Sequence, residues 1–138
     1  MSARVKCIMF LFLLVVLRPL FVNSQSTVYV KNAVEGNLKL TIHCKSKDED
    51  LGAVTLNPNQ SYRFVVFPKF FGGTLYFCTF RWPGSCHWFD IYVESRDLKI
   101  CYDDHPTACN WIIKKAGPCQ DSPLSNQCFK WNPNTCVP

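Results

Sequence analysis

The stretch LKLTIHC, residues 38–44, decides the fold. Its two leucines, isoleucine and cysteine occupy every second position, and lysine, threonine and histidine lie between them. Successive side chains of a β-strand point to opposite faces of a sheet, so this alternation indicates a strand with one buried face. We therefore start from a β-strand and look for its partners on both sides.

Short runs of the same kind recur along the chain. We expect further strands at residues 28–30, 62–67, 74–82, 88–93, 99–102 and 111–113. Turn signals separate them, as at Asn57-Pro58-Asn59 and Pro83-Gly84-Ser85, and residues 74–82 are apolar on both faces, as in a central strand. Seven or eight short strands without a sustained helical period predict a mainly all-β fold, a small antiparallel sandwich or barrel. The length of 138 residues suits one domain.

The N-terminal segment has the features of an export signal. Arg4 and Lys6 precede an unbroken apolar run over residues 8–17. That run is about half of the ~20 residues that a membrane-spanning helix needs. We predict a signal peptide over residues 1–24, with cleavage after Ser26 nearly as suitable, a secreted extracellular product and no membrane span after cleavage. A membrane anchor is the alternative.

Charge argues against nucleic acid as a partner. The segment 1–24 carries three basic and no acidic residues, so its removal lowers the formal net charge from +5 to +2. The remaining basic residues are scattered along the chain and form no stripe in the sequence. A protein that binds nucleic acid is expected to carry a strongly basic face, so we expect no nucleic acid here.

Cysteines dominate the rest of the chain. Eight follow residue 24: Cys44, Cys78, Cys86, Cys101, Cys109, Cys119, Cys128 and Cys136. An even, dense set in an exported chain predicts disulfides, and no closely spaced pair suggests zinc. Sequence alone leaves their connectivity open. Residues 119–138, rich in Pro, Ser, Asn, Gln and Cys, are expected to form a loop-like tail held by three of these cysteines.

Four phrases of the sequence resemble a known family. They are HCKSKDEDLG at residues 43–52, LYFCTFRW at 75–82, FDIY at 89–92, and CNW at 109–111 followed by Gly117. Their order and spacing resemble the plant self-incompatibility S-protein homologues over roughly residues 28–118, which sets the predicted domain at 25–118. The resemblance implies a β-sandwich with a minor helix. It also implies a secreted recognition ligand, because the family is named for stigma-secreted determinants read by a pollen-surface receptor.

The resemblance also bears on the disulfides. Four framework cysteines match Cys44, Cys78, Cys101 and Cys109, and the preferred pairing is Cys44 with Cys109 and Cys78 with Cys101. The chain departs from the family pattern by adding Cys86 and the three cysteines of the tail. If the framework pairs within itself, the three tail cysteines cannot all pair together. One of them must then bond to Cys86 or to another molecule, and we predict a bridge from the tail to Cys86 that pins the tail over the turn at residues 83–87.

No catalytic constellation stands out, so the chain is predicted not to be an enzyme. His43 lies on the polar face of its strand, and His87 and His105 lie beside turns, so two histidines for acid–base work in a nuclease are not apparent. The contiguous acids at residues 48–50 lack the spacing and glycine of a calcium loop. We expect no metal and no cofactor.

Function then depends on the surface. The candidates for receptor contact are Lys45, Lys47, Asp48, Glu49 and Asp50 in one polar loop and Asp103, Asp104 and His105 in a second. A Cys44–Cys109 bridge would bring these two loops together. Asn59, in the sequon Asn59-Gln60-Ser61, is a predicted N-glycosylation site at a turn.

These features predict a monomeric ligand for a cell-surface receptor, in rejection of self pollen or another plant cell–cell signalling process. A secreted defence protein, antimicrobial or inhibitory, is the alternative, and a secreted nuclease is the third class considered. Strong membrane activity would call for a more basic, amphipathic surface than a charge of +2 provides.

Overall fold

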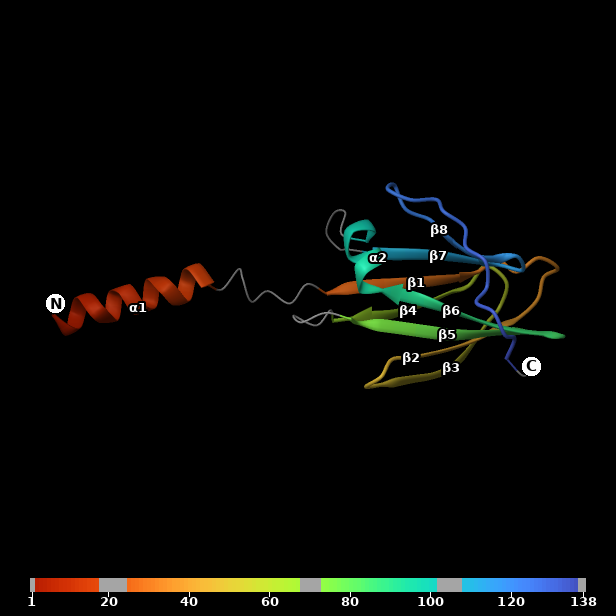
Figure 1. Cartoon of the computed structure of the whole chain (residues 1–138), viewed down its shortest axis with the longest axis horizontal. Coiled ribbons are helices and arrows are strands. Elements are labelled where there is room, and N and C mark those ends of the chain that lie inside the picture. The colour runs from red at the N-terminus through yellow and green to blue at the C-terminus, as the bar shows by residue number, and fades with distance from the viewer. Residues whose placement is uncertain (1, 18–24, 68–72, 102–107, 137–138) are drawn as a thin grey trace.

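Two four-stranded sheets form the molecule (Figure 1). The computed structural model describes residues 2–17, 25–67, 73–101 and 108–136. One sheet has the strand order β4 (Ser61–Val66), β1 (Ser26–Asn32), β7 (Ala108–Lys114), β8 (Gly117–Gln120). The other has the order β3 (Asp50–Leu56), β2 (Leu40–Lys45), β5 (Leu75–Trp82), β6 (Ser85–Val93). The predicted disulfide-stapled sandwich is confirmed, and of the named strand pairs only β1 and β7 run parallel.

The core lies between the two sheets and is built from the alternating side chains of their strands. Leu40, Ile42 and Cys44 are buried as the pattern of residues 38–44 predicts, and the strand begins at Leu40. They share the core with the fully buried Val28, Val30, Trp111 and Ile113 of the other sheet and Ile91 of their own sheet, among others. Each large apolar side chain removed from water contributes roughly 1.5–3 kcal/mol, so this shared layer holds the sheets together.

The strand expected at residues 99–102 is wrong. Residues 94–100 form a short helix, α2 (Glu94–Ile100), and residue 102 lies outside the described part of the chain. The helix starts where the Asp97 carboxylate accepts the Val93 N–H at 2.7 Å. At its start the Glu94 carboxylate also accepts the Thr74 N–H, at 3.0 Å. This local bond and the long-range contact to Thr74 override a four-residue alternation that is too short to distinguish strand from helix. The minor helix that the family resemblance implies is α2.

Two strands were not expected, and both lie at sheet edges. β3 is largely exposed, with only Leu56 buried, and its pairing with β2 shifts register near Gly52, which has φ 75°. Such a bulge disrupts the alternation on which a sequence prediction depends. β8 has only four residues and pairs with β7.

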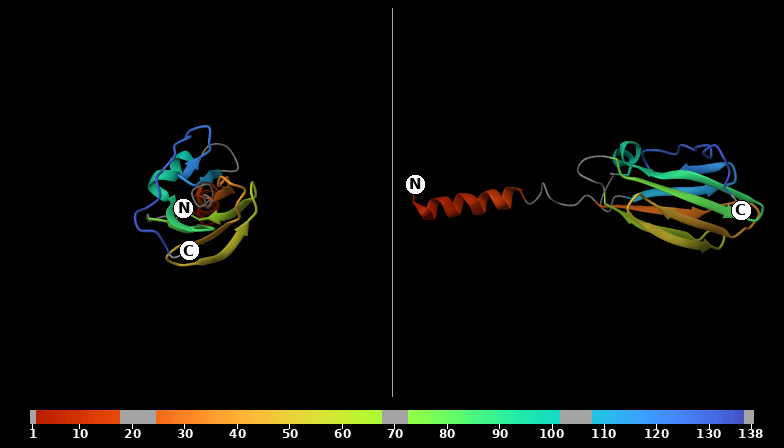
Figure 2. Two further views of the ribbon diagram at one scale, coloured as in Figure 1. Left: turned by 90° about the vertical axis from the view of Figure 1, so that its right-hand side faces the viewer. Right: turned by 60° about the horizontal axis from the view of Figure 1, so that its bottom comes forward.

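The C-terminal tail belongs to the folded domain. The predicted boundary after residue 118 falls inside β8, and all four residues of β8 are buried. Tail residues Phe129 and Trp131 pack against the core, and the Phe129 N–H donates to the Pro118 carbonyl at 2.9 Å. In Figure 2 the tail runs down one side of the sandwich, past the edge strands of both sheets.

Four disulfides staple the sandwich, and they correct the framework pairing. Cys44 bonds to Cys78 and Cys101 bonds to Cys109, so the preferred pairs Cys44–Cys109 and Cys78–Cys101 are wrong. The physical reason is register: Cys44 and Cys78 lie directly opposite each other on neighbouring strands β2 and β5. Parity led to the right tail bridge, because Cys86 bonds to Cys136. The fourth bridge closes the tail from Cys119 to Cys128.

The strand directions give the sandwich two distinct ends (Figure 1). The α2 end carries the turn at residues 46–49, the start of β5 and α2. The hairpin end carries the turns at residues 57–60, 83–84 and 115–116. Outside the sandwich, residues 3–17 form helix α1 (Ala3–Leu17), whose described side chains are exposed. No helix in the described ranges is long and apolar enough to cross a membrane.

Candidate recognition surface

The turn at residues 46–49 is tightly organised. The Ser46 N–H donates to the Glu49 carbonyl at 2.8 Å and closes the turn between β2 and β3. The Ser46 hydroxyl accepts the N–H groups of Asp48 and Glu49 at 3.3 and 3.2 Å. A serine side chain that caps its own turn in this way limits the conformations of the backbone. The charged side chains of the turn are therefore displayed from a fixed backbone.

Two of the charged residues anchor this turn to the sandwich. The buried Tyr76 donates its hydroxyl to Glu49 Oε1 at 2.6 Å. Burial, together with that carboxylate, raises the pKa of Tyr76 to about 12, so the phenol remains a hydrogen-bond donor at neutral pH. Asp50 Oδ1 accepts the Gly52 N–H at 2.9 Å and lies 2.5 Å from His43 Nε2. The hydrogen bond from the Gly52 N–H, followed in size by the hydrogen bond with the His43 ring, lowers the pKa of Asp50.

The tip of the turn is formed by Lys47 and Asp48, both exposed. Lys45 stands beside it, with Nζ 5.7 Å from the centre of the Phe77 ring. All five charged candidates of this loop are thus brought together, but in two roles. Glu49 and Asp50 hold the loop, whereas Lys45, Lys47 and Asp48 are presented to solvent.

Two grooves flank the start of β5 beside this turn. One, of about 630 Å³, lies between residues 46–49 and a wall that includes Val65, Phe67 and Leu75. The other, of about 390 Å³, lies between Leu75 and α2. Phe67 and Leu75 are 60% and 39% exposed, which is unusual for large apolar side chains next to a rigid polar turn. A mixture of exposed apolar and fixed charged groups is typical of a protein-binding surface.

A buried ion pair fixes α2 behind these grooves. The carboxylate of the fully buried Asp97 lies 2.7 Å from the Arg96 guanidinium. That guanidinium packs 5.1–5.3 Å from the ring centres of Phe89, Trp111 and Phe129. A buried ion pair costs desolvation unless further hydrogen bonds complete it, and here Asp97 also accepts the Val93 N–H. The arrangement ties α2 to both sheets and to the tail.

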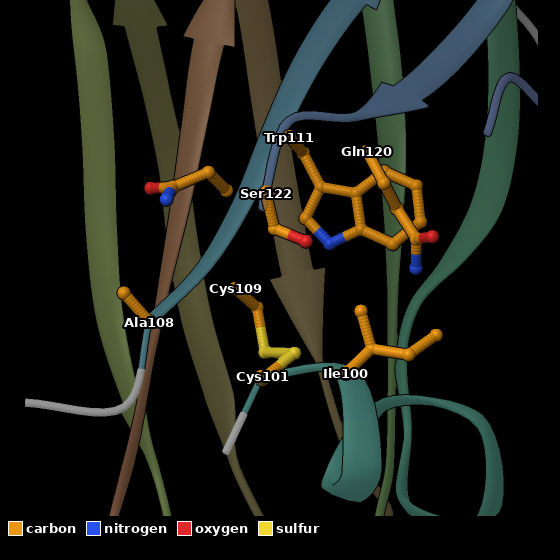
Figure 3. Close-up of a pocket in the computed structure, with 8 residues that line it drawn as sticks. Ile100, Cys101, Ala108, Cys109, Trp111, Gln120 and Ser122 are labelled. Carbon is orange, nitrogen blue, oxygen red and sulfur yellow. A yellow bond between two sulfur atoms is a disulfide. The ribbon is translucent and has the colours of Figure 1, made fainter. Parts of the chain in front are cut away.

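A small cavity lies next to this cluster, under α2 (Figure 3). The Cys101–Cys109 disulfide, Trp111, Gln120 and Ser122 line it, and its volume is about 10 Å³. That is room for about one water molecule, so the cavity is part of the scaffold and not a ligand site.

Comparison with known proteins places the chain in a family. Residues 27–131 match the family model described as plant self-incompatibility protein S1. The chain belongs to this family. Two relatives from Arabidopsis thaliana, S-protein homolog 2 and S-protein homolog 20, are each 43% identical to it. The matches cover 81% and 76% of this chain, and 71% and 75% of the relatives.

A solved structure shows the same fold. It is described as a structure of self-incompatibility protein homologues, a widespread family of small, highly stable, secreted proteins from plants. The two chains are 18% identical, with a TM-score of 0.53 over 78% of this chain and 94% of that one. The S-protein homologue family is one of secreted plant proteins, and the predicted extracellular location of this member is confirmed.

The second candidate loop of this family member is not placed. Asp103, Asp104 and His105 lie outside the described residues. Because Cys44 bonds to Cys78, no Cys44–Cys109 bridge draws these residues to the first loop. Their flanking residues Cys101 and Ala108 nevertheless lie at the α2 end, joined to β7 through the Cys101–Cys109 disulfide.

The other sequence candidates have local partners. His43 contacts Asp50, whereas the His87 ring stacks on Trp131 with 5.1 Å between ring centres. Across the described ranges no group of three or more histidine, cysteine or acidic residues could hold a metal ion. Sequence reasoning missed Tyr76, Phe67 and Leu75. Alternation marks Tyr76 as a core residue of β5, but nothing in the sequence reveals that its hydroxyl reaches Glu49.

Proposed function

We propose that this S-protein homologue is a secreted ligand read by a cell-surface receptor, with the α2 end as the surface that the receptor contacts. It acts as a monomer in rejection of self pollen or in another plant cell–cell signalling process. It is not an enzyme, and its function depends on surface shape and charge. The observation that carries the proposal is the hydrogen-bonded turn at residues 46–49 beside the two grooves that flank the start of β5.

The physical argument rests on preorganisation. A loop that is ordered before binding loses little conformational entropy on binding, so its contacts count almost fully toward affinity. Ser46 and Tyr76 fix the backbone of this turn and the orientation of Glu49. Lys47 and Asp48 can then provide charge complementarity, and Phe67 and Leu75 can provide apolar contacts at its side.

A cell-binding experiment tests this function. The labelled protein, secreted from a eukaryotic cell line, is applied to protoplasts from pistil, pollen tube and leaf. A receptor ligand should bind at least one of these cell types saturably, in competition with unlabelled protein, and the binding should disappear after the cells are treated with protease. No saturable binding to any tissue would overturn the proposal.

The same preparation separates the alternative function. A defence protein should permeabilise microbial cells or inhibit a protease at concentrations that leave plant protoplasts unlabelled. Such a result, together with absent cell-surface binding, would assign the chain to defence.

A further inference from the structure

The outer face of the sheet β4-β1-β7-β8 carries three exposed cations on three adjacent strands. They are Arg63 on β4, Lys31 on β1 and Lys114 on β7. Tyr29 lies opposite Arg63, so Lys31, two residues further along β1, is the diagonal neighbour of Arg63. Ile112 lies opposite Lys31, which makes Lys114 its diagonal neighbour on the other side. The sheet thus aligns three residues that are far apart in the sequence, with diagonal neighbours roughly 7–8 Å apart.

No acidic residue shares this face on those three strands. Strand side chains alternate, and the inward positions are buried core residues such as Val30, Phe64 and Trp111. The outward positions next to the cations on these three strands are neutral: Ser61, Val65, Thr27, Tyr29, Asn110 and Ile112. Three positive charges therefore face solvent without an opposing charge on the same strands.

The basic character continues around the hairpin end. Lys115, next to Lys114, is exposed in the turn between β7 and β8. One carboxylate is nearby: Glu35 accepts the Lys115 N–H at 2.9 Å, and this bond and the two lysine charges lower the pKa of Glu35. We call Lys31, Arg63, Lys114 and Lys115 the basic face. Four cations against Glu35, with Asp121 beside Asn110 on the far side of β7, leave it positive.

The acids of the domain are concentrated elsewhere. Of the eight acidic residues that the structure describes, five lie at the α2 end: Asp48, Glu49, Asp50, Glu94 and Asp97. Glu35 lies at the hairpin end, Asp90 on β6, and Asp121 just after β8, where its N–H donates to the Asn110 carbonyl at 2.9 Å. Four cations, Lys45, Lys47, Arg96 and Lys99, lie among these acids, so the α2 end is nearly neutral, whereas the basic face carries an excess of positive charge. Scattered basic residues in a sequence do not exclude a basic face.

We propose that the basic face binds an acidic polysaccharide of the plant extracellular matrix, a chain of uronic acid sugars with carboxylates at regular intervals. The face is a row of cations across a sheet, which suits an extended polyanion better than a compact anion. Arg63 can pair with a carboxylate through two parallel hydrogen bonds, and the lysines act as point charges. Tyr29, half-buried between Arg63 and Lys31, offers a ring on which a sugar can pack.

A lipid surface fits this face less well. Binding in a membrane interface needs apolar side chains that enter the acyl region alongside the cations. On this face the large apolar candidates, Val65 and Ile112, are half-buried within the sheet. The protein is secreted, so carboxylated matrix polymers are the polyanions that it meets. The basic face lies on the other sheet from the turn at residues 46–49, so this proposal is independent of the receptor proposal.

Affinity electrophoresis tests the proposal. The secreted full chain is run under native conditions through gels that contain de-esterified polygalacturonate, fully methyl-esterified pectin or a neutral galactan. We expect retardation by polygalacturonate alone, with an apparent dissociation constant that rises as salt is added, because exposed charges are screened within about 10 Å at 0.1 M salt.

A pair of matched variants locates the site. The triple substitution Lys31→Gln, Arg63→Gln, Lys114→Gln removes three charges from the basic face. The control Lys45→Gln, Lys99→Gln, Lys130→Gln removes three exposed charges elsewhere, so both variants have the same net charge. We expect the basic-face variant to bind polygalacturonate about tenfold more weakly or worse, because it loses charged contacts to the carboxylates of the polymer. The control variant should bind almost as well as the unmodified protein. Circular dichroism checks that both fold, and Arg63→Gln alone, with a smaller effect, substitutes for the triple variant if that one misfolds.

Three results would overturn the proposal. One is equal weakening by the two variants, which would indicate attraction by net charge alone. The second is no retardation by polygalacturonate at about 0.1 M salt. The third is binding to phosphatidylserine vesicles, or to an RNA oligonucleotide, that is tighter than binding to polygalacturonate and is lost in the basic-face variant.

Discussion

Gly117 illustrates how one residue connects the tail to the sandwich. It has φ 147°, and a Cβ atom added there would lie 1.9 Å from the Phe129 carbonyl oxygen. We expect Gly117→Ala to displace the tail from β8 and to lower the free energy of unfolding by roughly 1–3 kcal/mol more than Gly84→Ala does. Gly84 is the matched control, because it has φ 82° but no atom within 4 Å of an added Cβ. If urea denaturation shows that both variants lower the free energy of unfolding equally, the close approach of Phe129 is unimportant for stability.

His87 should make stability depend on pH. Its ring packs 5.1 Å from both Trp82 and Trp131, and burial lowers the pKa of His87 below its ordinary value of 6.5. The unfolded chain then binds this proton more readily than the folded one. The contribution of His87 to the free energy of unfolding is therefore fully present above pH 6.5. It declines as the pH falls from there toward the lowered pKa of His87 in the folded state.

Urea titrations at a series of pH values test this dependence. His87→Phe keeps an aromatic ring in the stack without a titrating group, so the part of the pH dependence just below 6.5 should flatten in this variant. An unchanged profile would assign that dependence to other groups.

Asn59 is the residue at which we expect covalent modification. It is exposed, has φ 67°, and lies in the turn between β3 and β4 at the hairpin end. An N-linked glycan there would project away from the turn at residues 46–49. The intact mass of protein secreted from plant cells should fall on glycosidase treatment, and Asn59→Gln should abolish the difference. A secreted product with the bare polypeptide mass would refute this expectation.

At the scale of elements, the tail acts as a strap over two edge strands. It bonds to β8 through Gln127 and Phe129, and the Trp88 indole on β6 donates to the Pro133 carbonyl at 3.0 Å. Trp131 packs between the Phe80, Trp82 and His87 rings. Covered edges cannot pair with other chains, so the strap also protects the β6 and β8 edges from edge-to-edge association.

The Cys86–Cys136 bridge should contribute more to stability than the bridge within the tail. It links residues 50 apart, whereas Cys119 and Cys128 are only 9 apart, and longer closed loops restrict the unfolded chain more. We expect Cys86→Ser with Cys136→Ser to lower the free energy of unfolding by about 2–4 kcal/mol. Cys119→Ser with Cys128→Ser should cost less. The reverse order in urea denaturation would contradict this account.

The strands and disulfides differ in how far the sequence alone predicts them. Alternation over residues 38–44 predicts β2 because one face of that strand is buried and the other is not. β3 was not predicted because its bulge and exposed edge position leave little alternation of apolar and polar side chains. Parity limited the partner of the odd tail cysteine to Cys86 or another molecule, and the Cys86–Cys136 bond confirms the first. Pairing Cys44 with Cys78 required the register of β2 against β5. The charges at residues 45–50 were visible in the sequence, whereas the Tyr76 anchor depends on three-dimensional proximity.

For the whole molecule, the central feature is a rigid sandwich with two separate charged surfaces. The α2 end presents the anchored turn at residues 46–49, and the basic face lies on the opposite sheet. Helix α1 lies outside this body, and we predict that residues 1–24 are a signal peptide, so the secreted form should begin near Gln25. Edman sequencing or intact mass measurement of the secreted protein tests that start, and a retained segment 1–24 would contradict it.

The most direct test of the central claim is the equilibrium binding of variants to plant protoplasts that bind the unmodified protein. Lys47→Glu with Asp48→Lys reverses both charges at the tip of the turn. Lys39→Glu with Asp121→Lys reverses one exposed charge of each sign away from that turn and serves as the control. If the receptor reads the α2 end, the first variant should bind about tenfold more weakly or worse, and the control should bind like the unmodified protein. Undiminished binding of the first variant, or equal loss in both, would contradict the account.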